Sequence, residues 1–451
     1  MNETTILAEQ AARLTYDDLP PEVVRKAKLL LLDQLGCQLA FATLPWGKAA
    51  LSYTTAKRGA GRSTIAYYGT RTNAEDAAFC NGVFGHGFEM DDVEMQTTSH
   101  PAVCVVPAML AVGDEQASTG REVLAAMVSG YETFLRFAHA ADAMRHRFFH
   151  CTAVAGAFGA AAAAGQLLGF DELTMRDALA IATTQASGNT EYSCSGGTVK
   201  RTLGALGAYA GVRSALLAQA GITGSSQALE GRKSFVKGIC EGEPDWEWLT
   251  LPFAERFLTL DVGVKPYCCC AAQHTVIDAA ELIRARGIDP AAIESVTILQ
   301  LPREVGNVGQ IVHPEDVIQA QFCGRFACAM RLVKGGNGYY DYTMDNIADP
   351  AITALIDKIG YAADDGRAVL DDGDGPARVT VRMADGATYE ETVAFAKGTK
   401  QNPLTEDELV AKFRDLTSRA LTPERADRVI EMVMNLEAEE SITRLTSLLT
   451  A

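Results

Sequence analysis

Apolar residues recur at helical spacing through most of the first half of the chain. Residues 20–22, Pro-Pro-Glu, suit the first turn of a helix, and the following VVRKAKLLLLDQLG runs to Gly36, a plausible stop. A second helix is predicted to begin at Thr119, which forms a capping box with Glu122, and a third near Thr174. Strands and helices do not alternate here, so this half is predicted to be helical.

The most apolar long stretch, residues 152–170, consists mainly of Ala and Gly rather than of Leu, Ile and Phe. Small residues let helices approach one another closely. The stretch is therefore predicted to be a buried, tightly packed helix, and a membrane span is the less favoured interpretation.

The pattern changes after about Val262. SVTILQL at 295–301 is typical of a strand, and the segments at 377–383 and 388–396 flank an Asp385-Gly386 turn, which predicts a hairpin. Helical segments are predicted at 319–333, at 352–359 and from Thr405, where TEDELVAKF contains a second capping box.

A chain of 451 residues is too long for one hydrophobic core, so more than one domain is expected. The chain is predicted to be mainly α. We expect a large helical domain formed by residues 1–262 and 401–451, and a smaller α+β domain at 263–400. The helical tail is expected to pack back on the first domain.

The formal net charge is −17, and no long basic run occurs. Nucleic acids and anionic membranes are therefore poor partners. The eleven cysteines include no C-x-x-C pair, and the start of the chain shows no signal peptide. These features favour reduced, mostly buried thiols and a cytoplasmic protein.

Polar residues gather first around HGFEMDD and TTSH, which contain His86, Glu89, Asp91, Asp92 and His100. The functional interpretation is a site loop in which carboxylates orient or charge His100. The alternative is a solvated acidic loop with a capping Asp, and the pattern alone leaves both open.

Two further clusters contain His146 with His150, and Lys200 after two glycines. A histidine pair at i, i+4 on a helix could bind zinc, but HRFFH lacks the Glu of the H-E-x-x-H motif, and Arg145 and Arg147 would repel a cation. SGGTVKR lacks the spacing of a phosphate loop, although glycine N–H groups and a lysine can hold a carboxylate. G-x-G-x-x-G is absent, so a dinucleotide cofactor has no support.

The last cluster is KPYCCCAAQH, in which Lys265 and His274 enclose Cys268, Cys269 and Cys270. Three adjacent cysteines cannot all face one metal ion, and no second Cys/His pair completes four ligands. No metal is predicted here.

Taken together, eight stretches resemble the 2-methylcitrate dehydratase family, also called MmgE/PrpD, and they occur in family order over nearly the whole chain. These stretches are DLPPEVVRKAKLLLLDQLG, HGFEMDD, SHPAVCVVPAMLAVGDE, HCTAVAGAFGAAAAAGQLLG, GGTVKR, LEGRKSF, KPYCCCAAQHTVIDA and KGTKQNPLTEDELVAKF.

The resemblance implies a helical domain built from both chain ends, an inserted α+β lid domain and a homodimer. It also implies an active site between the domains that needs no metal or organic cofactor. Family activities are dehydration of 2-methylcitrate, decarboxylation of cis-aconitate and epimerisation of iminodisuccinate, all on small polycarboxylates.

Carried over onto this sequence, the resemblance implies two groups of site residues. The catalytic candidates are His100, Asp91, Asp92, His150, Lys265 and His274. The substrate-binding candidates are Glu89, Lys200, Lys265 and Cys270. In this interpretation most of the cysteines only line the pocket, and Lys265 and His274 are the functional residues.

The chain departs from the family at Glu89, usually Asp; at Val93, usually Thr; at Cys268, usually Pro; and at Phe326, where a Tyr is expected. These changes touch the pocket and leave the reaction open. We expect a cofactor-independent lyase that removes a proton alpha to a carboxylate and eliminates water. The alternatives are an epimerase, a decarboxylase, a metal-dependent hydrolase built on the histidine clusters, and a binding protein without catalysis.

Overall fold

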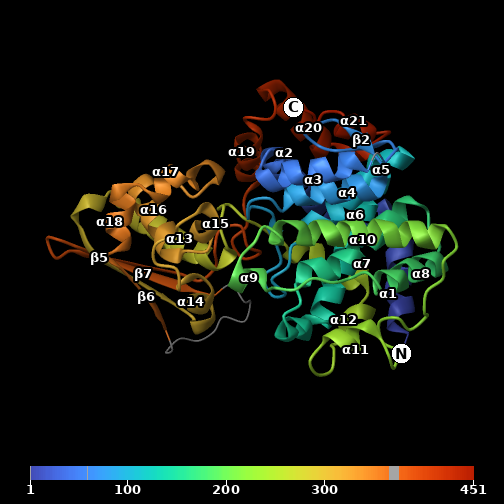
Figure 1. Cartoon of the computed structure of the whole chain (residues 1–451), viewed down its shortest axis with the longest axis horizontal. Coiled ribbons are helices and arrows are strands. Elements are labelled where there is room, and N and C mark those ends of the chain that lie inside the picture. The colour runs from blue at the N-terminus through green and yellow to red at the C-terminus, as the bar shows by residue number, and fades with distance from the viewer. Residues whose placement is uncertain (1, 58, 365–374) are drawn as a thin grey trace. The chain divides into compact units, whose positions relative to one another are not determined.

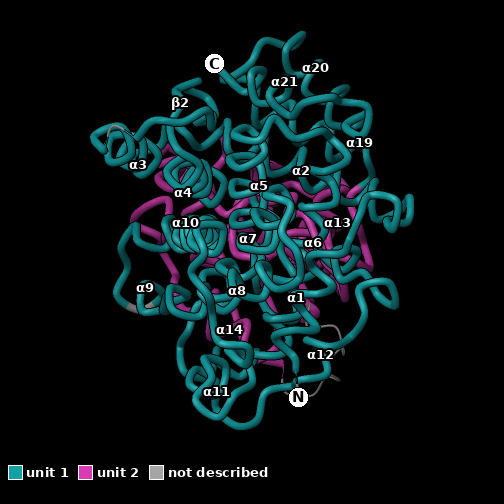
Figure 2. Tube along the Cα trace, turned by 90° about the vertical axis from the view of Figure 1, so that its right-hand side faces the viewer, with its two compact units in different colours: residues 1–87, 91–262, 405–451 teal, residues 88–90, 263–404 magenta. Residues whose placement is uncertain are grey.

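The computed structural model describes residues 2–57, 59–364 and 375–451. The chain forms two compact units, coloured separately in Figure 2. Unit 1 comprises residues 1–87, 91–262 and 405–451, and unit 2 comprises residues 88–90 and 263–404. The predicted fold class is confirmed, because unit 1 is built of helices and unit 2 adds a small mixed sheet.

Unit 1 contains fifteen of the described α-helices and both termini (Figure 1). The helices are α1 (Glu3–Arg13), α2 (Pro21–Phe41), α3 (Pro45–Ala56), α4 (Ala74–Gly85), α5 (Ala102–Gln116), α6 (Gly120–Ala140), α7 (Cys151–Leu167), α8 (Glu172–Ala182), α9 (Tyr192–Ser195), α10 (Lys200–Gln219), α11 (Phe235–Ile239), α12 (Glu247–Thr250), α19 (Glu406–Thr417), α20 (Pro423–Met434) and α21 (Thr443–Thr446). Its strands are β1 (Ser63–Thr64), β2 (Arg71–Thr72) and β3 (Asp92–Val93).

Helix α7, rich in Ala and Gly, lies at the centre of unit 1 and packs against α6 and α10. A Cβ atom at Gly159 would lie 2.8 Å from the carbonyl oxygen of Gly130 on α6, so only glycine allows this approach. Residues 151–165 of α7 are all buried. The apolar stretch is therefore a core helix, as the sequence predicted.

Among the described residues, no single helix is long and apolar enough to cross a membrane. The bent pair of α2 and α3 reaches the required length and apolar composition only when its two helices are taken together.

The prediction that the first long helix stops at Gly36 is wrong, because α2 continues to Phe41. A Cβ atom at Gly36 would lie 3.2 Å from the Phe413 ring on α19. Gly36 therefore marks the close approach of a distant helix rather than a helix end, and glycine serves both purposes.

The C-terminal helices pack on α2 and α5 within unit 1. Lys412 of α19 forms an ion pair of 2.5 Å with Asp33 of α2, and both side chains are buried. Burial raises the pKa of the Asp33 carboxyl, and the Lys412 charge opposes that shift. The tail thus supplies the cation for a carboxylate in the first long helix.

Unit 2 contains a four-stranded mixed sheet in the order β6-β5-β7-β8. Strand β5 pairs parallel with β6 and antiparallel with β7, and β7 pairs antiparallel with β8. The strands are β4 (Gly263–Val264), β5 (Ile293–Gln300), β6 (Ile359–Ala363), β7 (Ala377–Met383) and β8 (Thr388–Val393). The helices are α13 (His274–Arg284), α14 (Pro302–Val308), α15 (Val317–Gln321), α16 (Gly324–Lys334), α17 (Met344–Ile347) and α18 (Pro350–Ile356).

The predicted hairpin is present, with Gly386 at φ 88° between β7 and β8. Two details differ from the prediction. The helix predicted at 319–333 is broken into α15 and α16, and the end of the segment at 352–359 turns into strand β6. Strand β6 is short and depends on β5, a partner about sixty residues away, so local sequence does not signal it.

The buried pair gives a stability test. We expect Lys412→Met to lower the free energy of unfolding by about 3–5 kcal/mol, because Asp33 would keep a buried charge without a partner. Chemical denaturation followed by tryptophan fluorescence measures this. The double variant Asp33→Asn/Lys412→Met removes both charges and should recover most of the loss. An equal loss in the double variant would contradict the charge explanation.

Candidate functional site

The loop that follows α4 carries the first polar cluster, in unit 1. His86 caps the end of α4, and a Cβ atom at Gly87 would overlap Phe41 and lie 2.8 Å from the Phe84 carbonyl oxygen. Further along, Glu94 and Ser99 exchange backbone hydrogen bonds, which closes a tight turn just before His100. These local contacts bring His100 back toward the start of the loop.

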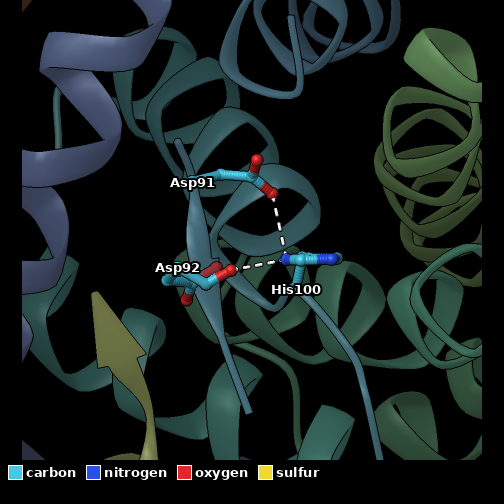
Figure 3. Close-up of side chains that lie close together, drawn as sticks. All are labelled: Asp91, Asp92 and His100. Atoms are coloured by element: carbon cyan, nitrogen blue, oxygen red, sulfur yellow. Dashed lines mark hydrogen bonds and ion pairs between the residues drawn. The ribbon is translucent and has the colours of Figure 1, made fainter. Parts of the chain in front are cut away.

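Asp91 is the centre of the cluster. Its Oδ2 atom lies 2.9 Å from Nδ1 of His86 and 3.2 Å from Nδ1 of His100. Figure 3 shows the Asp91 carboxylate directed at the His100 ring. Asp91 and His86 are fully buried, and His100 is 8% exposed. One carboxylate oxygen thus orients two imidazoles in an interior where a charge needs such partners.

The tautomer of His100 follows from its other contact. Nδ1 of His100 lies 2.5 Å from the backbone carbonyl oxygen of Asp92, which can only accept a hydrogen bond (Figure 3). Nδ1 therefore carries the hydrogen, and Nε2 is the nitrogen left to exchange a proton. The backbone N–H of His100 is held in turn by Oγ1 of Thr152 at 3.1 Å.

Asp92 has a different environment from Asp91. The backbone N–H of Ala102, at the start of α5, lies 3.1 Å from each carboxylate oxygen, and the Tyr131 hydroxyl donates to Oδ2 at 3.1 Å. Burial raises the pKa of the Asp92 carboxyl well above its ordinary value, and the nearby Asp91 charge adds to the rise. Asp92 therefore anchors α5 and positions the His100 loop.

His150 caps the N-terminus of α7 and has the opposite tautomer to His100. Its Nδ1 accepts the Ala153 backbone N–H at 3.3 Å, so in the neutral ring Nε2 carries the hydrogen. A helix N-terminus also disfavours a cation there. His150 is therefore suited to donate a hydrogen bond to an anion while staying neutral, whereas His100 is suited to transfer a proton.

Aromatic contacts join the remaining members of unit 1. The His86 ring centroid lies 5.4 Å from that of His100 and 6.4 Å from that of His150. The Tyr192 ring lies 5.8 Å from the His150 ring, and Nζ of Lys200 lies 5.8 Å from the Tyr192 centroid. The Tyr192 ring thus has both the His150 imidazole and the half-buried Lys200 ammonium as neighbours.

Unit 2 contains the second group of predicted residues. Glu89 adopts φ 61°, which is uncommon for a residue with a side chain, and its Oε2 lies 3.6 Å from Nζ of Lys265. Both side chains are buried. The strained backbone therefore serves to direct a carboxylate at the lysine.

The first cysteine of the run holds this arrangement in place. The Cys268 thiol donates to the Phe88 carbonyl oxygen at 2.9 Å, and Nε2 of Gln321 donates to the same oxygen at 3.1 Å. The residue before Glu89 is thereby fixed by the residues that follow Lys265. Cys268 acts as a structural donor.

The other two cysteines differ in exposure. Cys269 is fully buried, and burial raises the pKa of its thiol to about 12, whereas Cys270 is half-buried. His274 begins α13 and is buried, with its ring 5.2 Å from the Tyr267 ring. A neutral buried thiol is inert, so Cys269 is a packing residue rather than a nucleophile.

The metal-ligand interpretations have little structural support. His146 and His150 do not share a helix, because Phe148 adopts φ 64° between them, and His146 is exposed. Among the described residues, ligand atoms of Asp91, Asp92 and His100 lie within 4.8 Å of one another, a spacing that a metal ion could span. However, Nδ1 of His100 faces a carbonyl, and Asp92 already accepts hydrogen bonds at both oxygens. These three groups fit a hydrogen-bonded assembly better than a ligand set.

Three features of the site were not found from the sequence. They are the sharing of Asp91 by two histidines, the hydroxyl of Tyr131 on Asp92, and Tyr192 between His150 and Lys200. In the sequence, Tyr131 has the helical spacing of a core residue. Its hydroxyl meets Asp92 only because α6 packs beside the loop that carries Asp92, and local sequence does not reveal that packing. A Tyr in the polar stretch before the two glycines is the one signal that could have indicated Tyr192.

Comparison with known proteins now decides the family. Residues 5–247 match the MmgE/PrpD N-terminal domain, and residues 267–438 match the MmgE/PrpD C-terminal domain. The chain belongs to the MmgE/PrpD family.

Three relatives are similar over nearly their whole length. A cis-aconitate decarboxylase-like protein of Aspergillus oryzae is 28% identical over 481 residues, which cover 99% of this chain and 97% of the relative. The cis-aconitate decarboxylase of Aspergillus terreus is 28% identical, with 99% and 95% covered. The human cis-aconitate decarboxylase is also 28% identical, with 97% and 92% covered.

The two groups of residues can be tested by substitution. We expect His100→Ala and Lys265→Ala each to lower turnover by at least about 100-fold, because one removes the proton carrier and the other a buried cation. Cys269→Ser should cost less than about tenfold, since a neutral wall thiol carries no charge in the reaction. Steady-state kinetics with circular dichroism as a folding control measures this. A thiol variant as damaged as the lysine variant would contradict the assignment.

Asp92 gives a second test, through pH. A carboxyl whose folded-state pKa is raised contributes stability at low pH, and that contribution is lost as the pH rises through the folded pKa. Asp92→Asn cannot ionise. The Tm of the variant minus that of the wild type should therefore increase from about pH 5 to about pH 8. Asp407→Asn, at an exposed position, is the control. A difference that stays constant or shrinks would refute the buried-carboxyl explanation.

Proposed function

We propose that this protein is a lyase that decarboxylates a small polycarboxylate of the cis-aconitate type without a metal or organic cofactor. The observation that carries the proposal is the His100 imidazole, fixed through Nδ1 by Asp91 and the Asp92 carbonyl so that Nε2 can transfer a proton. Similarity to cis-aconitate decarboxylases over 97–99% of the chain supports the choice of reaction.

This preference revises the order in which the sequence alone ranked the reactions. Dehydration of a 2-methylcitrate-like substrate came first there, and decarboxylation was an alternative. The three relatives described above are named as decarboxylases or decarboxylase-like proteins, and they support the alternative over the first choice.

The chemistry needs few groups. In cis-aconitate the carboxylate that leaves is attached to a CH₂ group next to the double bond. When that C–C bond breaks, CO₂ departs, the electron pair shifts the double bond, and negative charge develops on the carbon alpha to another carboxylate. An acid then protonates that carbon. The protein must supply cations where charge develops and one positioned proton donor.

The residues of unit 1 suit the proton transfer. We assign the transferred proton to Nε2 of His100, since the Asp91 carboxylate at Nδ1 stabilises the charged ring that serves as acid. His150, neutral with Nε2–H, would hold a carboxylate oxygen, and Lys200 would offset its charge. Asp92 positions His100 rather than reacting.

For unit 2 we propose binding roles. Lys265 would pair with a substrate carboxylate and neutralise its charge. Glu89, the buried partner of Lys265, already neutralises part of the lysine charge and would limit how many substrate carboxylates the lysine can bind. His274 and Cys270 would complete the polar surface near Lys265. These assignments keep the residues implied by the family resemblance.

We also propose that two copies of the chain form a homodimer. Several large apolar side chains of unit 1 remain exposed, which supports an assembly that covers them: Tyr53, Val199, Leu206 and Leu217.

The activity test uses metal-stripped protein with cis-aconitate, 2-methylcitrate, citrate and iminodisuccinate supplied separately. We expect CO₂ release from cis-aconitate alone, at a rate unchanged by EDTA, because hydrogen bonds already occupy Asp92 and Nδ1 of His100, which belong to the ligand-like group found among the described residues. A vinyl product from a hydroxy acid would establish a dehydratase instead. C–H exchange without a new product would indicate an epimerase, and recovery of activity only on adding a divalent metal would overturn the cofactor-free mechanism.

A further inference from the structure

His86 has no role in the proposed reaction, yet it is fully buried and makes a short contact to its central carboxylate. Nδ1 of His86 lies 2.9 Å from Oδ2 of Asp91, closer than Nδ1 of His100 at 3.2 Å. Because the carboxylate oxygen only accepts, Nδ1 of His86 carries the hydrogen. The same oxygen therefore accepts the N–H of His86 and lies within ion-pair distance of His100, whose Nδ1 hydrogen is directed at the Asp92 carbonyl oxygen.

The opposite edge of the His86 ring is unlike that of the other two histidines. Among the residues that the structure describes, none offers Nε2 of His86 a hydrogen-bond partner, and the ring has no exposed surface. The ring contacts the His100 and His150 rings side-on, with centroids 5.4 and 6.4 Å away. Its one identified polar contact is thus the one to Asp91.

We propose that His86 is a positioning residue that acts on His100 through Asp91. Its Nδ1–H fixes the rotation of the Asp91 carboxylate and takes up part of that charge. The Asp91 carboxylate then stabilises the charged form of His100 less strongly, so His100 releases its Nε2 proton more easily. The inference rests on the proposed role of His100 in proton transfer.

Several other charged or titratable groups lie around the cluster of His86, Asp91 and Asp92 or beside its nearest neighbours, and they contribute to the same field. They come from α2, α6, α19 and the start of α7: Lys26, Asp33, Tyr131, Lys412 and His150. A substitution at His86 leaves all of them in place. A change in the behaviour of His100 in such a variant therefore reports on the His86–Asp91 contact.

Two matched variants separate the two edges of the ring. In His86→Asn the amide can occupy the position of Nδ1 and keep the N–H to Asp91. In His86→Gln the amide lies at the position of Nε2, and the N–H to Asp91 is lost. We expect His86→Asn to keep the wild-type pH profile with cis-aconitate. We expect His86→Gln to lose about tenfold or more in kcat/KM, mainly through kcat.

The pH profile gives the direction. Without the His86 donor, Asp91 interacts more strongly with the charged form of His100. Because His100 must be protonated to act as the acid, the alkaline limb of kcat/KM should move to higher pH in His86→Gln. In an Asp91→Asn background the same substitution should cause no further movement, since the connecting group is gone. An unmoved alkaline limb in folded His86→Gln would overturn the proposal. So would a loss in His86→Asn as large as in His86→Gln, because it would show that the Nε2 edge matters.

A measurement that does not depend on turnover can test the role of His86 independently of the proposed reaction. Nitrogen NMR of wild-type protein carrying ¹⁵N-histidine, assigned with the His86→Asn and His100→Gln variants, reports the tautomer of each ring. We expect hydrogen on Nδ1 of both His86 and His100, and a His100 titration that shifts upward in His86→Gln. Hydrogen on Nε2 of His86 would overturn the inference even if His86→Gln fails to fold. If the wild-type protein releases no CO₂ from cis-aconitate while the NMR result holds, only the proposed reaction fails.

Discussion

One buried carboxylate oxygen, Oδ2 of Asp91, organises the polar cluster of the helical unit. It accepts an N–H from His86, lies 3.2 Å from Nδ1 of His100, and has no access to solvent. A carboxylate in such a place persists only if its hydrogen-bond partners are held in position. The end of α4, the starts of α5 and α7 and the middle of α6 all contribute to that task through His86, Ala102, Thr152 and Tyr131.

The same oxygen explains why neighbouring acids have different roles. Asp91 faces two imidazoles, whereas Asp92 faces the backbone of α5 and a tyrosine hydroxyl, and burial raises its pKa well above the ordinary value. His100 and His150 also differ, since one presents Nδ1–H to its acceptors and the other accepts an N–H at Nδ1. Identical side chains thus acquire separate roles from the backbone atoms beside them.

Much of the fold could be read from local signals. The capping boxes at Thr119 and Thr405 and the Asp385-Gly386 hairpin stand where the sequence placed them, because each is settled within a few residues. Gly36 and strand β6 were misread, because a packed helix and a paired strand from far along the chain determine them.

The site shows the same difference between features set by local sequence and features set by distant contacts. The cluster of His100 with Asp91 and Asp92 was visible as composition, and the structure brings these residues together. The sharing of one oxygen, the tautomers and the Tyr131 hydroxyl depend on atoms from different helices, so no spacing rule could reveal them. In the second unit, the pairing of Glu89 with Lys265 was equally hidden, although both residues had been singled out.

The claim that one oriented acid, His100, delivers the proton can be tested by running the reaction with cis-aconitate in D₂O and following it by proton and deuterium NMR. The account predicts a product with a single deuterium on the carbon alpha to a carboxylate, all of it on one face. Deuterium on both faces of that carbon would mean that solvent, rather than a fixed imidazole, delivers the proton, and it would contradict the account.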